Sequence, residues 1–379
     1  MEEHYLDNSA TTRVLPEAAS EAARLMTACY GNPSSLHTLG FEAKKELDSA
    51  RAVIAKRLGA APEEVTFTGG GTEANNIAVL GAARARRRMG QHIVTTGTEH
   101  DSVLNAMRQL ENEGFKVTYL APKADGSIDP GELESAIGPG TVLVSVMLCN
   151  NETGAVLPVR AAARAIKVKR APAVLHTDCV QAFCKLDFTV KGLGVDMCTV
   201  SGHKVHAPKG VGALYVRKGV RVLPIMYGGG QERGLRSGTE SLPLIGAFAK
   251  AVELAPKAPE TLERIGELRG LLLEKLAGVP GVEVNSPEEG LPYIVNLSVP
   301  GVRAETMLHF LAQRGVYVSA GSACGKARPS HVLEAMGLSR ERVASAIRVS
   351  FSRFSTEEDV EALAEGIGEG IKSLAKERG

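Results

Sequence analysis

Short hydrophobic runs alternate with amphipathic stretches along the first 250 residues of the chain. Residues 92–96 (HIVTT), 116–120 (KVTYL) and 212–216 (GALYV) are β-rich and have the length of buried strands, about four to eight residues. Residues 16–30 and 40–59 place Ala, Leu, Val and Ile at helical spacing, and a glycine suits the end of each helix. Buried strands that alternate with helices predict an α/β fold with a mostly parallel sheet.

The hydrophobic pattern predicts further strands and helices over the rest of the chain. Further strands are expected at residues 64–68, 141–148, 173–178 and 196–201, and further helices at 101–114, 130–138 and 159–170. Helical runs at 242–255 and 262–278 indicate the passage into a second domain, with strands at 282–285, 293–299 and 316–321 and helices at 304–315 and 357–379. We therefore predict a large domain over residues 13–255 and a smaller α+β domain formed by 1–12 and 256–379.

Composition narrows the class of protein. The chain has 379 residues, 44% hydrophobic and 23% charged, with a net charge of +1, and this balance does not favour nucleic acid or a membrane surface as a partner. We expect no signal peptide, and no apolar run approaches the roughly 18 residues of a membrane helix. Since the six cysteines form no C-x-x-C pair, the sequence predicts no metal site and a reduced, cytoplasmic protein.

Lys204 directly follows a β-rich run, in the segment SGHKVHAPKGVGALYV at residues 201–216. A lysine at the end of a buried strand is costly unless it is neutralised, paired or used in chemistry. A lysine with a lowered pKa suits a Schiff base to an aldehyde. Taken alone, the segment is explained equally well by an exposed lysine in a glycine-rich turn.

Asp178 also ends an apolar run, in HTDCVQAF at residues 176–183. An acid at the carboxyl end of a strand faces the crevice where α/β sheets bind ligands, and it can hold the protonated ring nitrogen of a pyridine cofactor. Gln181, three residues further on, can reach the same ring. Taken alone, Asp178 is more often a helix N-cap.

Two further strand ends complete the set. FTGGGTEANN at residues 67–76 opens a helix after three glycines and can bind phosphate, although strand-to-helix geometry explains the glycines almost as well and the segment is not a P-loop. His100, in TTGTEHDSV, can stack on a ring and move protons, although a lone histidine more often caps or packs. Together with Asp178 and Lys204, these segments describe a pyridoxal phosphate site.

Nine segments resemble the cysteine desulfurases of the NifS/IscS type, which are class V aminotransferase-like, fold-type I pyridoxal phosphate enzymes. They are YLDNSATT, GNPSSLHTLG, FTGGGTEANN, TEHDSV, NNETG, HTDCVQ, SGHKVHAPKGVGALY, GGGQERGLRSGT and SAGSAC. They occur in the order of the family, from about residue 5 to residue 355. The resemblance implies a large domain with a mostly parallel seven-stranded sheet and a smaller α+β domain.

The resemblance also implies a role for each matched residue. Lys204 would form the Schiff base with pyridoxal 5′-phosphate, Asp178 would pair with the pyridine nitrogen, and Gln181 with the ring hydroxyl. His100 would stack on the ring and shuttle protons. The residues implied for the cofactor phosphate are Gly71, Thr72, Ser201 and His203.

Three residues would complete the cofactor and substrate sites. Thr239, in RSGT, would reach the phosphate from the partner subunit, which implies an obligate homodimer. Asn151 and Arg348 would hold the substrate carboxylate, with Asn151 also beside the cofactor. A guanidinium fork suits a carboxylate well.

Cys324, in SAGSACGKARPSHV, would be the nucleophile. Small residues let this segment move, and Lys326 and Arg328 can lower the pKa of its thiol. The implied reaction converts L-cysteine to L-alanine and leaves the sulfur as a persulfide on Cys324. The implied partner is a sulfur-acceptor protein, either a scaffold for iron–sulfur cluster assembly or an enzyme that thiolates tRNA or a cofactor.

The chain departs from the family at two places. Only GKAR separates Cys324 from PSHVL, a shorter loop than is common in the iron–sulfur-assembly members, so the resemblance does not identify the acceptor. Cys179 stands where alanine is expected, and we interpret it as a packing residue, as we do Cys149 and Cys198.

Alternative functions on the same scaffold are a selenocysteine lyase, another class V aminotransferase-like enzyme, and a non-catalytic binding scaffold. The GSAC segment argues against an aminotransferase, which needs no nucleophilic cysteine. The joint presence of Lys204, Asp178, His100 and Cys324 argues against a non-catalytic scaffold.

Overall fold

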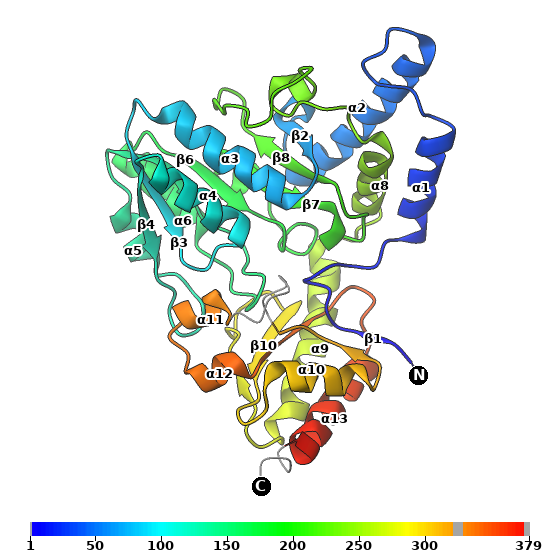
Figure 1. Ribbon diagram of the computed structural model, residues 1–379, viewed down its shortest axis with the longest axis vertical. Coiled ribbons are helices and arrows are strands. Elements are labelled where there is room, and N and C mark those ends of the chain that lie inside the picture. The colour runs from blue at the N-terminus through cyan, green and yellow to red at the C-terminus, as the bar shows by residue number, and fades with distance from the viewer. Residues whose placement is uncertain (1, 321–328, 375–379) are drawn as a thin grey trace.

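The computed structural model describes residues 2–320 and 329–374 (Figure 1). Within these residues a seven-stranded sheet has the order β2-β8-β7-β6-β5-β3-β4. Its strands are β2 (Val65–Thr68), β3 (His92–Thr96), β4 (Lys116–Leu120), β5 (Thr141–Ser145), β6 (Val174–Asp178), β7 (Met197–Ser201) and β8 (Gly212–Val216). β8 is antiparallel to both of its neighbours, β2 and β7, and all other pairs in this sheet are parallel. The predicted α/β fold with a mostly parallel seven-stranded sheet is confirmed.

Helices alternate with the strands of this sheet along the chain. Every residue of its central strands β5, β6 and β7 is buried. Burial of whole strands is the pattern of a parallel sheet covered on both faces. The helices are α1 (Pro16–Thr27), α2 (Thr38–Leu58), α3 (Gly71–Arg86), α4 (Asp101–Asn112), α5 (Pro130–Ala136), α6 (Val159–Lys169), α7 (Val190–Leu193) and α8 (Leu242–Glu253). Short 3₁₀ turns lie at Pro62–Glu64, Gly202–Lys204 and Glu232–Gly234.

The C-terminal part builds two small sheets. An antiparallel sheet has the order β12-β10-β9, and a pair of short parallel strands joins β1 near the N-terminus to β11. The strands are β1 (His4–Tyr5), β9 (Glu283–Val284), β10 (Ile294–Ser298), β11 (Val316–Tyr317) and β12 (Ala346–Ser350). The helices are α9 (Ala258–Ala277), α10 (Ala304–Ala312), α11 (His331–Ala335), α12 (Arg340–Ala344) and α13 (Glu357–Leu374).

The elements of the C-terminal part agree only partly with the sequence prediction. The expected strand at 316–321 is two residues long, and the sequence did not predict β1, β12, α11 or α12. The predicted division after residue 255 falls between α8 and α9, and the division into domains stays a prediction.

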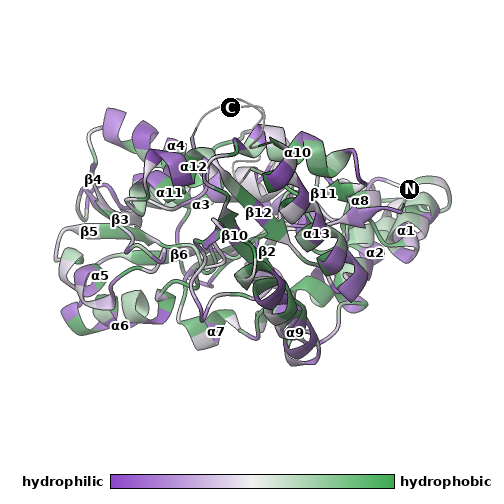
Figure 2. Cartoon of the chain, turned by 90° about the horizontal axis from the view of Figure 1, so that it is seen from below, coloured by the Kyte–Doolittle hydropathy of each residue, from purple (hydrophilic) through white to green (hydrophobic). Residues whose placement is uncertain are grey.

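Seen from below, β10 and β12 are hydrophobic strands set among helices whose outer faces are hydrophilic (Figure 2). The described helices include none that combines the length and the apolarity needed to cross a membrane.

A buried ion pair fastens the segment that follows β8 to the large sheet. The two terminal guanidinium nitrogens of Arg51 donate to the Glu232 carboxylate, at 2.7 and 2.8 Å, and Glu232 Oε2 also accepts from the Phe67 amide at 3.0 Å. Glu232 has a φ of 48°, a left-handed conformation that is uncommon outside glycine. The ion pair therefore fixes the segment that leads to Thr239.

Candidate active site

Ten of the predicted site residues line one cavity of about 300 Å³ at the carboxyl edge of the parallel strands. They are Gly71, Thr72, His100, Asn151, Asp178, Gln181, Ser201, His203, Lys204 and Arg348. Thr239 is not among them; it is exposed, three residues before α8. Cys324 lies outside the described residues.

The turn between β2 and α3 provides one end of the cavity. A Cβ at Gly71 would lie 2.9 Å from Val180 Cγ2, so a side chain there would require Val180 to shift. Glu73 fastens the turn by accepting from the Gly69 amide at 2.7 Å. The first amides of a helix lack acceptors within the helix, and the helix dipole adds positive potential there. Ser201 Oγ is buried and has no hydrogen-bond partner within the described part of the chain. This end of the cavity suits an anion.

Lys204 lies deep in the cavity wall. Its Nζ donates to the carbonyls of Ser9 and Ala10, the latter at 2.7 Å. Burial, together with the nearby cations Arg348 and Lys185, lowers the pKa of Lys204 to about 7. Of the two interpretations that the sequence left open, the exposed lysine is wrong. An amine that titrates near neutral pH is suited to covalent chemistry.

A hydrogen-bonded chain connects Asp178 to His100. Asn75 Nδ2 donates to Asp178 Oδ2 at 2.7 Å and to Ser102 Oγ at 2.9 Å. Ser102 Oγ lies 2.8 Å from His100 Nδ1, which also accepts from the Ser102 amide at 3.1 Å. Because Nδ1 accepts, neutral His100 carries its proton on Nε2. The second Asp178 oxygen accepts from the Val180 amide at 2.9 Å.

The Asp178 carboxylate thus accepts hydrogen bonds from two donors. Asp178 is the last residue of β6, in the strand-end position that the sequence predicted. His100 is also the N-cap of α4, so it both caps this helix and lines the cavity. His203 lies between Ser201 and Lys204, and burial lowers its pKa to about 4. His203 is therefore neutral at pH 7 and acts there as a hydrogen-bonding group.

Arg348 stands at the centre of β12 and is 1% exposed. Its guanidinium donates to Asp7 Oδ1 at 3.0 Å and to the Asn151 carbonyl at 3.1 Å. Burial raises the pKa of Asp7, although Arg348 and Lys204 act in the opposite direction. Arg348 and Lys204 thus bring two cationic groups to one cavity.

The sequence analysis missed several residues of this site. Asn75 connects Asp178 to Ser102, Asp7 holds Arg348, and the carbonyls of Ser9 and Ala10 hold Lys204. Asn75 lies in FTGGGTEANN and Asp7 in YLDNSATT, two segments that carry the family resemblance, but nothing in these segments predicts their contacts. Cys149 also lines the cavity, but burial raises the pKa of its thiol to about 12, which fits a packing residue better than a nucleophile.

The residues present fit pyridoxal phosphate. Three features converge on one cavity: an end suited to an anion, where the buried Ser201 hydroxyl has no partner among the described residues; a buried carboxylate that accepts two hydrogen bonds; and a lysine whose pKa is lowered to about 7. This donor set matches a phosphate, a pyridine nitrogen and an aldehyde respectively.

Comparisons with known proteins agree with this fit. The family profile of aminotransferase class-V matches residues 4–363. The chain is 43% identical over 375 residues to a cysteine desulfurase of Trichormus azollae, covering 98% of this chain and 93% of the relative. A solved NifS-like protein matches with a TM-score of 0.92 and 38% identity over 98% of this chain and all of that one. SspA, solved in complex with cysteine, matches with a TM-score of 0.82 and 36% identity over 93% of this chain and all of that one.

The lowered pKa of Lys204 leads to a testable prediction on the cofactor-free protein. An amine-reactive reagent should modify Lys204 faster as the pH rises, and the midpoint of this increase should lie near pH 7, because only the neutral amine reacts. For an ordinary exposed lysine the same midpoint lies at about pH 10.4. Mass spectrometry of the digested protein measures both rates, with the exposed Lys191 as the internal control.

The Arg348→Met variant tests the cause of that shift. It removes the charged neighbour that lowers the pKa of Lys204 most, so the midpoint should move to higher pH. A Lys204 midpoint that coincides with that of Lys191, or that stays in place in Arg348→Met, contradicts the electrostatic account.

Proposed function

The chain belongs to the cysteine desulfurases of the aminotransferase class-V family, and from this we propose that it binds pyridoxal 5′-phosphate and transfers the sulfur of L-cysteine to Cys324. The observation that carries the proposal is the position of Lys204, a lysine with a lowered pKa, in one cavity with Asp178, His100 and Arg348. The solved relative SspA in complex with cysteine supports the choice of substrate.

The cofactor would be held by residues of both ends of the cavity. Lys204 Nζ is the covalent attachment point, Asp178 pairs with the pyridine nitrogen, Gln181 with the ring hydroxyl, and His100 lies against the ring. The phosphate is held by Gly71, Thr72, Ser201 and His203. When bound, the cofactor supplies an electron sink for the carbons of the substrate.

Arg348 and Asn151 hold the substrate. The Arg348 guanidinium contacts Asp7 and the Asn151 carbonyl, so its plane is oriented before a carboxylate arrives. Lys204, with a pKa of about 7, gives up and takes back a proton at Nζ near neutral pH. His100 Nε2, which faces away from Ser102, is the second group that moves protons.

Cys324 takes the sulfur. Its thiolate attacks the substrate sulfur, a sulfur–sulfur bond forms, and the carbon–sulfur bond breaks. The electron pair of the broken bond stays on the carbon, which takes up a proton, so that Cys324 carries a persulfide and the product is L-alanine.

The described residues on either side of residues 321–328 support this role. Before that stretch, Ser319 and Arg348 exchange backbone hydrogen bonds at 3.1 and 2.6 Å. After it, Ser330 Oγ donates to the buried carboxylate of Glu152, and His331 Nε2 donates to the Glu99 carbonyl at 3.0 Å. Both flanks are therefore fixed at segments that also build the cavity wall.

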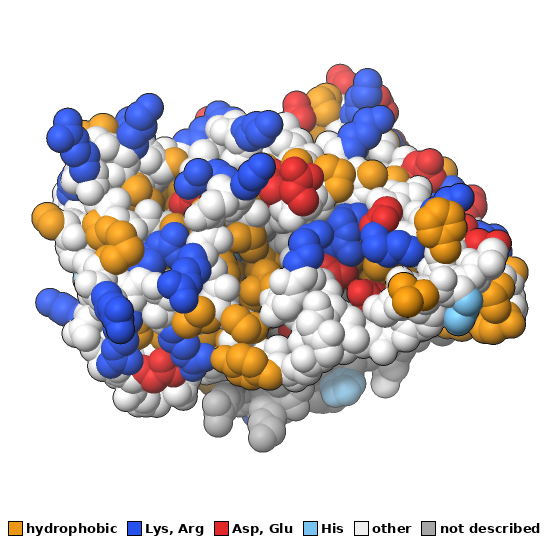
Figure 3. Space-filling view, turned by 90° about the horizontal axis from the view of Figure 1, so that it is seen from above, with side chains coloured by type: hydrophobic (Ala, Val, Ile, Leu, Met, Phe, Trp, Pro, Cys, Tyr) orange, Lys and Arg blue, Asp and Glu red, His pale blue; other side chains and the backbone are white. Residues whose placement is uncertain are grey.

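A homodimer completes the site in this proposal, with Thr239 of each subunit reaching the other subunit's phosphate. Thr239 is exposed and does not line the cavity of its own subunit. Large hydrophobic side chains are also exposed, notably Leu36, Tyr30, Phe41 and Tyr227. Figure 3, which views the molecule from above, shows hydrophobic side chains exposed between charged ones.

The cofactor assignment predicts a colour. Purified protein should be yellow from the lysine-bound cofactor, and Lys204→Ala should abolish the visible absorption band, because no amine remains at the attachment point. Lys191→Ala is the matched control and should keep the band. A colourless wild-type protein after incubation with pyridoxal phosphate would falsify the proposal.

The nucleophile assignment predicts a separate loss. Cys324→Ala should keep the yellow colour but lose sulfide release from L-cysteine by roughly 100-fold or more, since no thiolate accepts the sulfur. Cys29→Ala, at a cysteine outside the cavity, is the control. Sulfide release at the wild-type rate in Cys324→Ala would show that another group takes the sulfur.

Beyond the enzyme itself, we propose that the persulfide sulfur passes to an acceptor protein, a cluster scaffold or a thiolating enzyme. Co-purification from the native cell would identify it. If no protein carries labelled sulfur from L-cysteine in such extracts, the transfer step is wrong.

The shared site predicts complementation between two variants, one that cannot attach the cofactor and one that binds it weakly. In a mixed dimer of Lys204→Ala with Thr239→Ala, the subunit that keeps Lys204 receives Thr239 from its partner. That site should bind the cofactor with wild-type affinity, at one site per dimer, while the Thr239→Ala homodimer should bind several-fold more weakly. Equal weakness in the mixed dimer and the Thr239→Ala homodimer would place Thr239 in its own subunit's site.

A further inference from the structure

Lys185 is a buried lysine for which the proposed reaction gives no use. It is 7% exposed, and no described carboxylate forms an ion pair with it. Its Nζ lies 3.3 Å from Gln181 Oε1 and 5.7 Å from the centroid of the Tyr293 ring, and the thiols of Cys149 and Cys184 are also near enough to act on its pKa. A buried charge without a counter-charge is costly, and a hydrophobic residue of the same volume would avoid that cost.

The backbone directs Lys185 inward. Gln181 and Lys185 lie in the turn that follows β6, and Cys184 between them has a φ of 60°. This left-handed conformation is unfavourable for a residue with a Cβ. With Cys184 in this conformation, the turn brings Lys185 close to Gln181, which precedes it by four residues.

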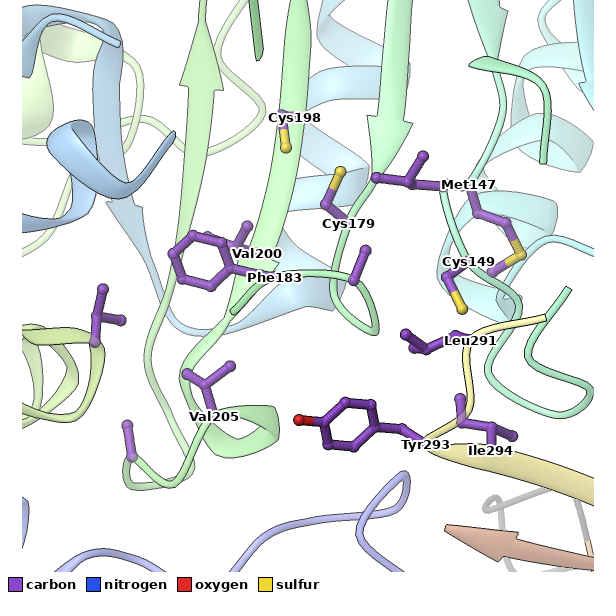
Figure 4. Close-up of a cluster of buried hydrophobic side chains, with 14 of the residues drawn as sticks. Met147, Cys149, Cys179, Phe183, Cys198, Val200, Val205, Leu291, Tyr293 and Ile294 are labelled. Atoms are coloured by element: carbon purple, nitrogen blue, oxygen red, sulfur yellow. The ribbon is translucent and has the colours of Figure 1, made fainter. Parts of the chain in front are cut away.

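Lys185 lies behind the cofactor cavity. It lines a second, small cavity of about 30 Å³ together with Lys204, Tyr293 and Arg353, whereas the larger cavity is lined by Lys204 and Gln181 but not by Lys185. Figure 4 shows Tyr293, with its hydroxyl group directed toward the side where Val205 lies, and both residues line the small cavity. Lys185 therefore contacts Gln181, which lines the larger cavity, without lining that cavity itself.

The two partners of the Gln181 amide determine its orientation. An ammonium group can only donate, so the amide atom that faces Lys185 is the oxygen. The carbonyl of Ser9 can only accept, and Gln181 Nε2 donates to it at 3.0 Å. Since Lys204 Nζ donates to the same carbonyl, the chain of contacts runs from Lys185 through Gln181 and Ser9 to Lys204.

On these contacts, and resting on the proposed function, we propose that Lys185 is a positioning residue that holds the Gln181 amide with its N–H side toward the cofactor ring. The contact with a cation also polarises the amide, which strengthens its N–H as a donor to a ring oxygen. Burial lowers the pKa of Lys185 to about 8, so the ammonium form predominates at pH 7.

A double-mutant cycle on cofactor affinity tests this route. Lys185→Met, which keeps the volume but not the charge, should raise the dissociation constant of pyridoxal phosphate by roughly 3- to 10-fold, equivalent to one hydrogen bond. In the Gln181→Ala background the same substitution should have no further effect, because Lys185 acts through that amide. The constants are measured from the visible absorption band, and Lys191→Met is the control.

The melting temperature of the cofactor-free protein separates positioning from packing. Lys185→Met should melt at the wild-type temperature or above it, because it removes a buried charge. If this variant does not fold, Lys185→Leu gives the same comparison.

The outcomes distinguish this inference from the proposed function. Loss of affinity with retained stability, and only when Gln181 is present, supports the positioning role. An unchanged affinity in Lys185→Met, or an equal loss with and without Gln181, overturns it even though the wild type is yellow. A colourless wild type overturns the proposed function first, and this inference with it.

Discussion

The burial of several cations around one cavity is the constraint on which the rest of the site depends. Lys204, Lys185 and Arg348 are withdrawn from water. Asp7 and Asp178 act on Lys204, and Asp7 also contacts Arg348, whereas no described carboxylate pairs with Lys185. Each buried charge costs several kcal/mol unless it is paired or neutralised. The folded chain meets this cost in two ways, by lowering the pKa of the lysines and by leaving the cavity ready for anionic groups.

The direction of the strands places those groups together. The residues after β2, β3, β5, β6 and β7 meet because the carboxyl ends of parallel strands share one edge of the sheet. This is why the sequence could predict much of the site: Lys204, Asp178 and His100 stand where hydrophobic runs end. From the sequence alone, the proposed Schiff-base role of Lys204 could not be distinguished from that of a surface lysine, and its burial in the structure favours the proposed role.

What the sequence could not give are contacts between distant segments. Asn75 lies inside a helix and has no local sign of its contact with Asp178, 103 residues away. Lys185 stands in a turn of mixed polarity, and only its burial distinguishes it from a surface lysine. The strand β12 was missed because the charged Arg348 stands at its centre, and that charge is tolerated there through its contacts with Asp7 and Asn151.

The N-terminal segment ties the two halves of the site into one unit. The Ser9 carbonyl accepts from both Gln181 and Lys204, while the Ser9 amide donates to Ser350 Oγ at 2.8 Å. Ser350 ends the strand that carries Arg348. A displacement of β12 against the large sheet would therefore strain the contacts of Lys204 as well as those of Arg348. The lysine proposed to bind the cofactor and the arginine proposed to bind the substrate keep their spacing because both are fastened to the same few residues of backbone.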